Sequence, residues 1–152
     1  MGESTKPNIL LVDDRAENLL VLEGVLDGEG YNLYKANSGA EALHIVLKQA
    51  FDLILLDVQM PGIDGFEVAR LLRGKKESKE VPIIFITAIN KDAKYISKGF
   101  ELGAENYLFK PIEPNILKEK VKNAIQYYRY KRQMKIYEEQ VQAKRQERVK
   151  RV

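Results

Sequence analysis

The sequence predicts an α/β fold in which a doubly wound, five-stranded parallel sheet is followed by an extended C-terminal helix. Five short apolar segments of strand length alternate with segments whose apolar residues recur every three or four positions, as in amphipathic helices. Parallel neighbours need crossover connections, and helical crossovers cover both faces of a sheet. At 152 residues the chain has the length of one ordinary domain.

The predicted strands are apolar segments that end in turn or polar residues. They are NILLVDD (8–14), YNLYKAN (31–37), FDLILLD (51–57), VPIIFITA (81–88) and AENYLFKP (104–111). The third segment is apolar without alternation from Leu53 to Leu56, which is typical of a strand buried on both faces. Asp57 therefore lies where a buried strand reaches the surface, and the turn residues Pro61 and Gly62 follow it.

Helical segments connect these strands, at residues 15–30, 38–50, 64–78 and 90–103. Ser38 with Glu41 three residues later predicts a capping box at the start of the second helix. Pro114 suits the first turn of a fifth helix. Because no Gly or Pro follows residue 123, we expect this helix to continue well beyond the domain.

Charge divides the chain into two parts. Residues 126–152 carry nine Lys or Arg and three Glu, a net charge of +6, whereas the remaining 16 basic and 19 acidic residues give the first 125 residues a net charge of −3. We therefore predict a globular domain at residues 6–125 and a helical extension at residues 126–152. No apolar run approaches the roughly 20 residues of a membrane span, no secretory signal opens the chain, and cysteine is absent. These features predict a cytoplasmic protein without membrane insertion.

The extension carries a short apolar seam. Its members, spaced three or four residues apart, are Tyr127, Tyr130, Met134, Tyr137 and Val141, as in a coiled coil. The seam is about two heptads long, so a charged helix that frays at its end is the alternative. The chain ends within this helix, which favours a module cut from a longer protein, where the helix would be a connector. In a stand-alone protein it would instead be a partner-binding or dimerising arm.

Polar side chains gather at the carboxyl ends of the predicted strands. They are Asp13 and Asp14 after the first strand, Asp57 after the third, Thr87 after the fourth and Lys110 after the fifth. In open parallel sheets, ligands bind at this edge. Three carboxylates directed at one spot repel one another, so the set indicates a hard cation, Mg²⁺, with Mn²⁺ as a substitute. A carboxylate nucleophile beside a metal, a hydroxyl and an ammonium group is suited to phosphoryl transfer.

These motifs resemble the receiver domain of two-component response regulators. The resemblance rests on LLVDD, LILLDVQMPGIDG, FITA and YLFKP, and extends over about residues 7 to 125. It implies the flavodoxin-like strand order 2-1-3-4-5. It also implies that Asp57 accepts a phosphoryl group and that Asp14 and Asp57 hold Mg²⁺, with Asp13 acting through water and the backbone carbonyl of Gln59 as another ligand.

The resemblance implies further roles. Thr87 and Lys110 would bind the phosphoryl oxygens, and Tyr107 would be an aromatic switch that turns inward when Thr87 moves toward the phosphate. The Lys110–Pro111 peptide bond would be cis. Gln59 and Ile89, two residues after Asp57 and Thr87, would set the lifetime of the aspartyl phosphate.

The expected function is two-component signal transduction. A sensor histidine kinase or phosphotransfer protein would supply the phosphoryl group, because the chain has no Gly-rich nucleotide loop and only one histidine, His44. The chain would catalyse its own phosphorylation and dephosphorylation, without turnover of a dedicated substrate. A homodimer would form through the C-terminal helix and the face between the fourth and fifth helices.

The sequence is less typical of two other classes of protein, an aspartate-dependent phosphatase and a nucleic-acid-binding module. A phosphatase similar to the haloacid dehalogenases would use an Asp nucleophile, but the VDDR sequence lacks the DxD spacing of such enzymes. A nucleic-acid-binding module is suggested by the basic tail, yet no helix-turn-helix or other reading element is found. We therefore expect no direct contact with nucleic acid.

Overall fold

The computed structural model describes residues 5–88, 93–101 and 106–151, with side chains of the fourth helix from Ile96 onward. Five parallel strands form one sheet in the order β2-β1-β3-β4-β5. The strands are β1 (Asn8–Val12), β2 (Asn32–Ala36), β3 (Leu53–Asp57), β4 (Ile83–Thr87) and β5 (Asn106–Phe109). The predicted doubly wound fold and its strand order are confirmed.

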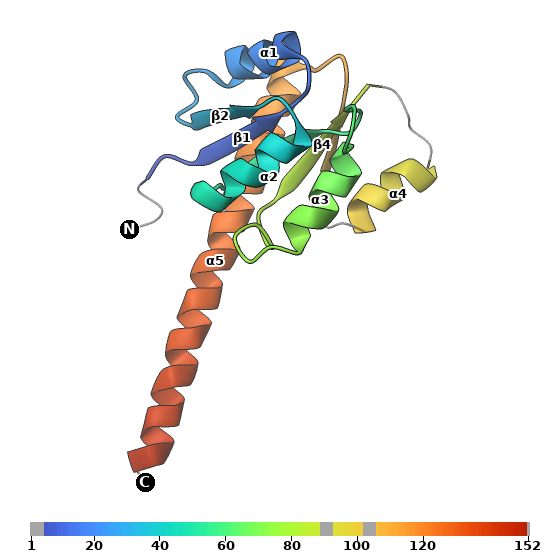
Figure 1. Ribbon diagram of the computed structural model, residues 1–152. Coiled ribbons are helices and arrows are strands. Elements are labelled where there is room, and N and C mark those ends of the chain that lie inside the picture. Colours follow the sequence, from blue (N-terminus) through green and yellow to red (C-terminus); the bar gives the residue numbers. More distant parts are fainter. Residues whose placement is uncertain (1–4, 89–92, 102–105, 152) are drawn as a thin grey trace.

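Helices connect the strands and cover both faces of the sheet (Figure 1). They are α1 (Ala16–Leu26), α2 (Gly39–Lys48), α3 (Gly65–Arg73), α4 (Ala93–Glu101) and α5 (Pro114–Arg151). One buried cluster joins the sheet to α2 and α3, and a second joins its other face to α1 and α5. Strand β3 contributes to both clusters, which is why its sequence is apolar without alternation.

Local sequence explains where several helices begin. The Ser38 hydroxyl accepts a hydrogen bond from the Glu41 amide at 3.1 Å, so the predicted N-cap is present. The Glu41 carboxylate accepts its bond from the amide of Asn37, the residue before the N-cap, at 2.7 Å, and not from Ser38 as in a capping box. Asp64 caps α3 in the same way, by accepting from the Glu67 amide at 2.9 Å.

Helix α5 is a single helix of 38 residues that leaves the body of the protein and extends away from it (Figure 1). Its first part buries Leu117, Val121 and Ile125 against the sheet. Past Lys135 every described residue is exposed except the half-buried Val141. Neither α5 nor any other described helix combines the length and apolar character needed to cross a membrane.

Candidate functional site: an acidic cluster at the carboxyl edge of the sheet

The site forms because parallel strands end at the same edge. Strands β1 and β3 are neighbours, with Val12 paired to Leu56, so Asp13 follows β1 at the level where Asp57 ends β3. Side-chain oxygens of Asp13, Asp14 and Asp57 lie within 4.8 Å of one another. Asp13 and Asp57 are buried, and Asp14 is exposed. The structure thus brings together the three carboxylates that the sequence selected.

Lys110 is the cation of the cluster. Its Nζ lies 3.4 Å from Asp13 Oδ2 and 3.5 Å from Asp57 Oδ1. Its backbone amide donates to the Thr87 carbonyl at 2.9 Å, which ties the end of β5 to the end of β4. The peptide bond between Lys110 and Pro111 is cis.

One ammonium group does not balance three carboxylates. Burial raises the pKa of Asp57 to about 6, the neighbouring Asp13 carboxylate adds to the rise, and Lys110 counteracts part of it. Asp57 is therefore held in an environment that disfavours its negative charge. A divalent cation with oxygen ligands would relieve that repulsion, so the donor set fits Mg²⁺.

The turn after Asp57 passes close to the strand that it leaves. A side chain at Gly65 would overlap the Asp57 carbonyl oxygen and would lie 2.8 Å from the Val58 Cα. Only glycine allows this approach. The Gly65 amide donates to the Val58 carbonyl at 2.8 Å, and Gly62 has a φ of +77°, so the MPGIDG segment folds back as a tight turn.

The other predicted residues lie around this cluster. Thr87 is fully buried at the end of β4, which neighbours β3. Gln59 is exposed and lies two residues beyond Asp57. Tyr107 in β5 is buried. Ile89 lies outside the described residues.

Sequence reasoning missed the residues that hold Asp13. Its Oδ1 accepts hydrogen bonds from the Arg15 amide at 3.0 Å and from Asn18 Nδ2 at 3.3 Å. The first bond spans two residues, which is the pattern of an Asx turn and is a common use of Asp at a strand end. Asn18 has no such signal, because its approach depends on how α1 packs.

A hollow of about 300 Å³ adjoins the cluster between α1 and the segment after β5. Asp13 and Lys110 line one side of it, and the apolar side chains of Val21, Leu22 and Ile112 line another.

Comparisons with known proteins agree with this geometry. The family model of the response regulator receiver domain matches residues 9–122. The transcriptional regulatory protein ResD of Bacillus subtilis is 40% identical over 122 residues, which cover 80% of this chain and 49% of that protein. The chain thus spans about half the length of the curated relatives that it matches.

Solved structures of response regulators are also similar to this chain. A protein from Chloroflexus aurantiacus described as a response regulator is 39% identical, with a TM-score of 0.75, and the match covers 80% of this chain and 99% of that one. The chemotaxis response regulator CheY4 of Vibrio cholerae is 31% identical, with a TM-score of 0.74 and coverage of 79% and 99%.

Receiver domains share a general function. Receiver domains act in two-component systems, where a histidine kinase is the partner and the phosphoryl group passes to an aspartate. They bind Mg²⁺ at an acidic pocket, and a cluster of aspartates is present here. The match to the family model, the relatives and the fold show that this chain belongs to the response regulator receiver domain family.

Proposed function

We propose that Asp57 is the aspartate that accepts the phosphoryl group. The observation that supports this is its position as the last residue of the buried strand β3, in a cluster with two further carboxylates and one ammonium group. In the transfer, an Asp57 oxygen forms the new bond to phosphorus while the bond from phosphorus to the kinase histidine nitrogen breaks, and the nitrogen keeps the electron pair.

Asp57 and Asp14 would hold Mg²⁺, with Asp13 acting through water and the Gln59 backbone carbonyl as a further ligand. The bound ion would neutralise negative charge on the phosphoryl oxygens. Mn²⁺ has the same preference for oxygen ligands, and we expect it to substitute. Asp13 is kept in place by Arg15 and Asn18, which leaves its Oδ2 facing Lys110.

Lys110 and Thr87 would stabilise the phosphorylated state. The Lys110 ammonium group, now shared between Asp13 and Asp57, would move to a phosphoryl oxygen, and the Thr87 hydroxyl would bind another. Movement of Thr87 would be coupled to Tyr107, the proposed switch in the neighbouring strand. Gln59 and Ile89 would set the rate at which water hydrolyses the acyl phosphate, so that the chain removes its own phosphoryl group.

The experiment is phosphorylation by acetyl phosphate in Mg²⁺, followed by borohydride reduction and peptide mapping. We expect one acid-stable reduction product, at Asp57, and none in Asp57→Asn, because an amide is a poor nucleophile. Asp27→Asn is the matched control, since Asp27 is an exposed aspartate at the end of α1. Stable labelling of Asp57→Asn, or labelling of the wild type at another residue, would contradict the assignment.

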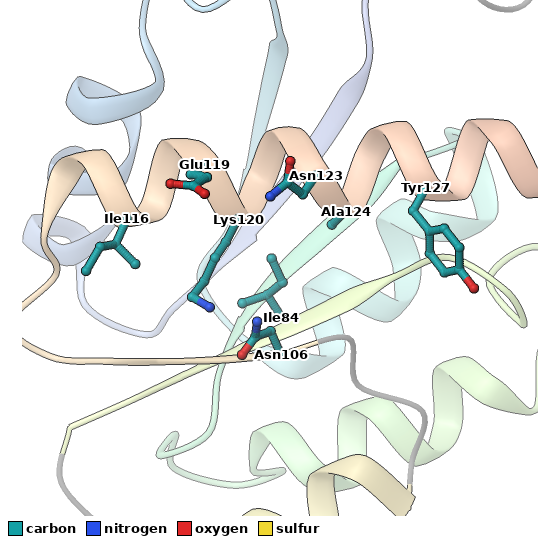
Figure 2. A pocket seen from close by; sticks show the side chains of 8 residues that line it. All are labelled: Ile84, Asn106, Ile116, Glu119, Lys120, Asn123, Ala124 and Tyr127. Atoms are coloured by element: carbon teal, nitrogen blue, oxygen red, sulfur yellow. The ribbon is translucent and has the colours of Figure 1, made fainter.

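We also propose that phosphorylation controls association of two copies through α5 and its neighbouring face. The seam side chains Tyr127, Tyr130 and Tyr137 are 53–60% exposed, and an unsupported helix of this composition is only marginally stable. Figure 2 shows Lys120 projecting from α5 toward Asn106 and Ile84, with Ile116 and Tyr127 further along the same side of the helix. These residues line a hollow of about 400 Å³. The seam is thus continuous with a groove beside β5.

Sedimentation with and without a beryllofluoride phosphate mimic tests the association. We expect beryllofluoride to increase the dimer fraction of the wild type and to have little effect on Tyr130→Asp/Tyr137→Asp. The control is Gln142→Asp/Ala143→Asp, which adds the same charge to exposed positions of α5 outside the seam. If the wild type is monomeric in both states, the helix is a connector to an output domain instead. In either case we propose that the chain acts in the cytoplasm with a sensor kinase or phosphotransfer protein.

A further inference from the structure

Tyr107 occupies a buried position against α4. Its side chain is 6% exposed, and its hydroxyl donates to the Ile96 carbonyl oxygen at 3.0 Å. Its ring meets the Phe100 ring edge-on at a centroid distance of 5.4 Å and the Phe85 ring at 5.5 Å. The hydroxyl and the ring are therefore both held by a pocket that α4 and β4 form together.

Gly99 lines this pocket at its tightest point. A Cβ at residue 99 would overlap the Tyr107 hydroxyl oxygen, and it would lie 2.7 Å from the Tyr107 Cζ and 2.9 Å from the Phe85 Cδ2. Carbon atoms in packed proteins do not approach so closely. No side chain, even that of alanine, fits at residue 99 while Tyr107 is in this position.

The backbone does not require glycine at this position. Only Gly28, Gly30 and Gly62 have positive φ among the described glycines, so Gly99 has a conformation that any residue can adopt. A glycine inside a helix weakens the helix relative to alanine. The chain therefore carries a residue that is unfavourable for α4, and the space that it leaves is filled by the Tyr107 hydroxyl.

We infer that Gly99 is a positioning residue for Tyr107: the missing side chain at residue 99 makes the buried position of the ring available. Any larger residue at this position displaces the ring from the pocket. The Ile96 carbonyl then loses its hydrogen bond from the hydroxyl, and Phe100, which is already 50% exposed, loses its edge contact. The role of Gly99 depends on the proposed function only in one respect, the link between the position of the Tyr107 ring and phosphorylation of Asp57.

The position of the ring is measured directly by ¹⁹F NMR of protein labelled with 3-fluorotyrosine. The Tyr107 resonance is assigned by its loss in Tyr107→Phe, and its solvent exposure is read from the broadening caused by a soluble gadolinium chelate. We expect little broadening in the wild type and strong broadening in Gly99→Ala. Gly24→Ala in α1 is the matched control, since a Cβ there has no atom within 4 Å. Equal protection of Tyr107 in all three proteins would overturn the inference.

A double substitution separates the positioning role from general packing. Gly99→Ala should lower the urea midpoint when Tyr107 is present. In a Tyr107→Ala background the loss should be much smaller, because the overlap with Tyr107 is gone and only the close contact with Phe85 Cδ2 opposes the gain in helix propensity. Gly24→Ala should raise the midpoint in both backgrounds. An equal loss from Gly99→Ala in both backgrounds would show that the glycine serves the packing of Phe85 or of α4, which would also overturn the inference.

Labelling with acetyl phosphate distinguishes failure of this inference from failure of the proposed function. We expect Gly99→Ala to be phosphorylated on Asp57 to the wild-type extent while Tyr107 stays exposed both with and without beryllofluoride. A wild type that is not labelled at Asp57 would refute the proposed function and leave the measured ring position intact. A Gly99→Ala protein in which beryllofluoride restores the protection of Tyr107 to the wild-type level would refute the role of Gly99.

Discussion

Two aspartates at opposite ends of β3 differ in how far their charge is balanced. Asp52, just before β3, is 7% exposed, and Asp57, at the end of β3, is 3% exposed. Arg129 from α5 pairs with both Asp52 oxygens, with Nε 3.0 Å from Oδ1 and Nη2 3.4 Å from Oδ2. The Asn8 amide donates to Asp52 Oδ2 at 3.0 Å. The protein thus supplies the Asp52 carboxylate with both a cation and a backbone hydrogen-bond donor.

Among the described residues, Asp57 has no such partner of its own. It shares one ammonium group, at 3.5 Å, with a second buried carboxylate, and its pKa rises to about 6. The two ends of β3 thus differ in whether a buried carboxylate has a cation of its own. The amino edge of the sheet is balanced by an arginine from α5, whereas the carboxyl edge keeps an excess of negative charge among the described residues.

We expect the largest effect from removing the cation that balances Asp52 at the amino end of β3. Arg129→Met leaves the Asp52 carboxylate without its cation in a largely buried place, and we expect a loss of about 2–3 kcal/mol in unfolding free energy. Urea denaturation measures this. Lys135→Met is the control, since its pair with Glu80 at 3.6 Å is exposed on both sides, and such pairs contribute less than about 1 kcal/mol. Equal losses in the two variants would show that Asp52 and Arg129 are not coupled.

We expect a smaller effect from lowering the pH, which acts on Asp57 at the carboxyl end of β3. Because the pKa of Asp57 is about 6, a proton competes with Mg²⁺ below that pH. We expect the Mg²⁺ dissociation constant to be flat above about pH 7 and to rise up to about tenfold for each pH unit below 6. Calorimetric titration measures it. A constant affinity from pH 8 to pH 5 would show that Asp57 does not lose a proton when the metal binds.

We expect the smallest effect from removing one of the hydrogen bonds that hold Asp13 in place. Asn18→Ala removes the longer of its two local hydrogen bonds, at 3.3 Å, while the Arg15 amide still donates at 3.0 Å. We expect Mg²⁺ affinity to fall by only about threefold, less than the roughly 10–100-fold typical of partners that orient a metal ligand. Asp14→Ala should weaken binding more. A loss of affinity in Asn18→Ala as large as that in Asp14→Ala would mean that the orientation of Asp13 determines the site.

The sequence was sufficient for the fold and for the cluster because both follow from local patterns. The alternation of segments predicted the sheet, and the unbroken apolar run of Leu53 to Leu56 placed Asp57 at the edge where Asp13 and Lys110 also end. Gly65 could also be understood from its turn, and the structure shows the close approach that requires it. The roles of the site residues stay predictions until phosphorylation is measured.

Contacts that depend on how a helix packs against the rest of the fold could not be predicted. Arg129 and Asp52 are 77 positions apart, and Arg129 lies in a run of charges where any member resembles the others. Gly99 was not singled out in the sequence, because nothing in its neighbours shows that Tyr107 from β5 fills the space beside it. In both cases the partner is chosen by the packing of whole elements, which no local pattern encodes.

The excess of negative charge at the carboxyl edge is measured by the unfolding free energies of wild type and Asp57→Asn at pH 8, each in chelator and in Mg²⁺. The raised pKa of Asp57 means that its charged form costs stability, a cost that grows as pH rises from about 4 through 6. In chelator we therefore predict that Asp57→Asn is more stable than wild type by about 1–2 kcal/mol. In Mg²⁺ we predict that the wild type gains more than the variant and that the difference disappears or reverses. A variant that is less stable than wild type in chelator, or an equal gain from Mg²⁺ in both proteins, would contradict the account.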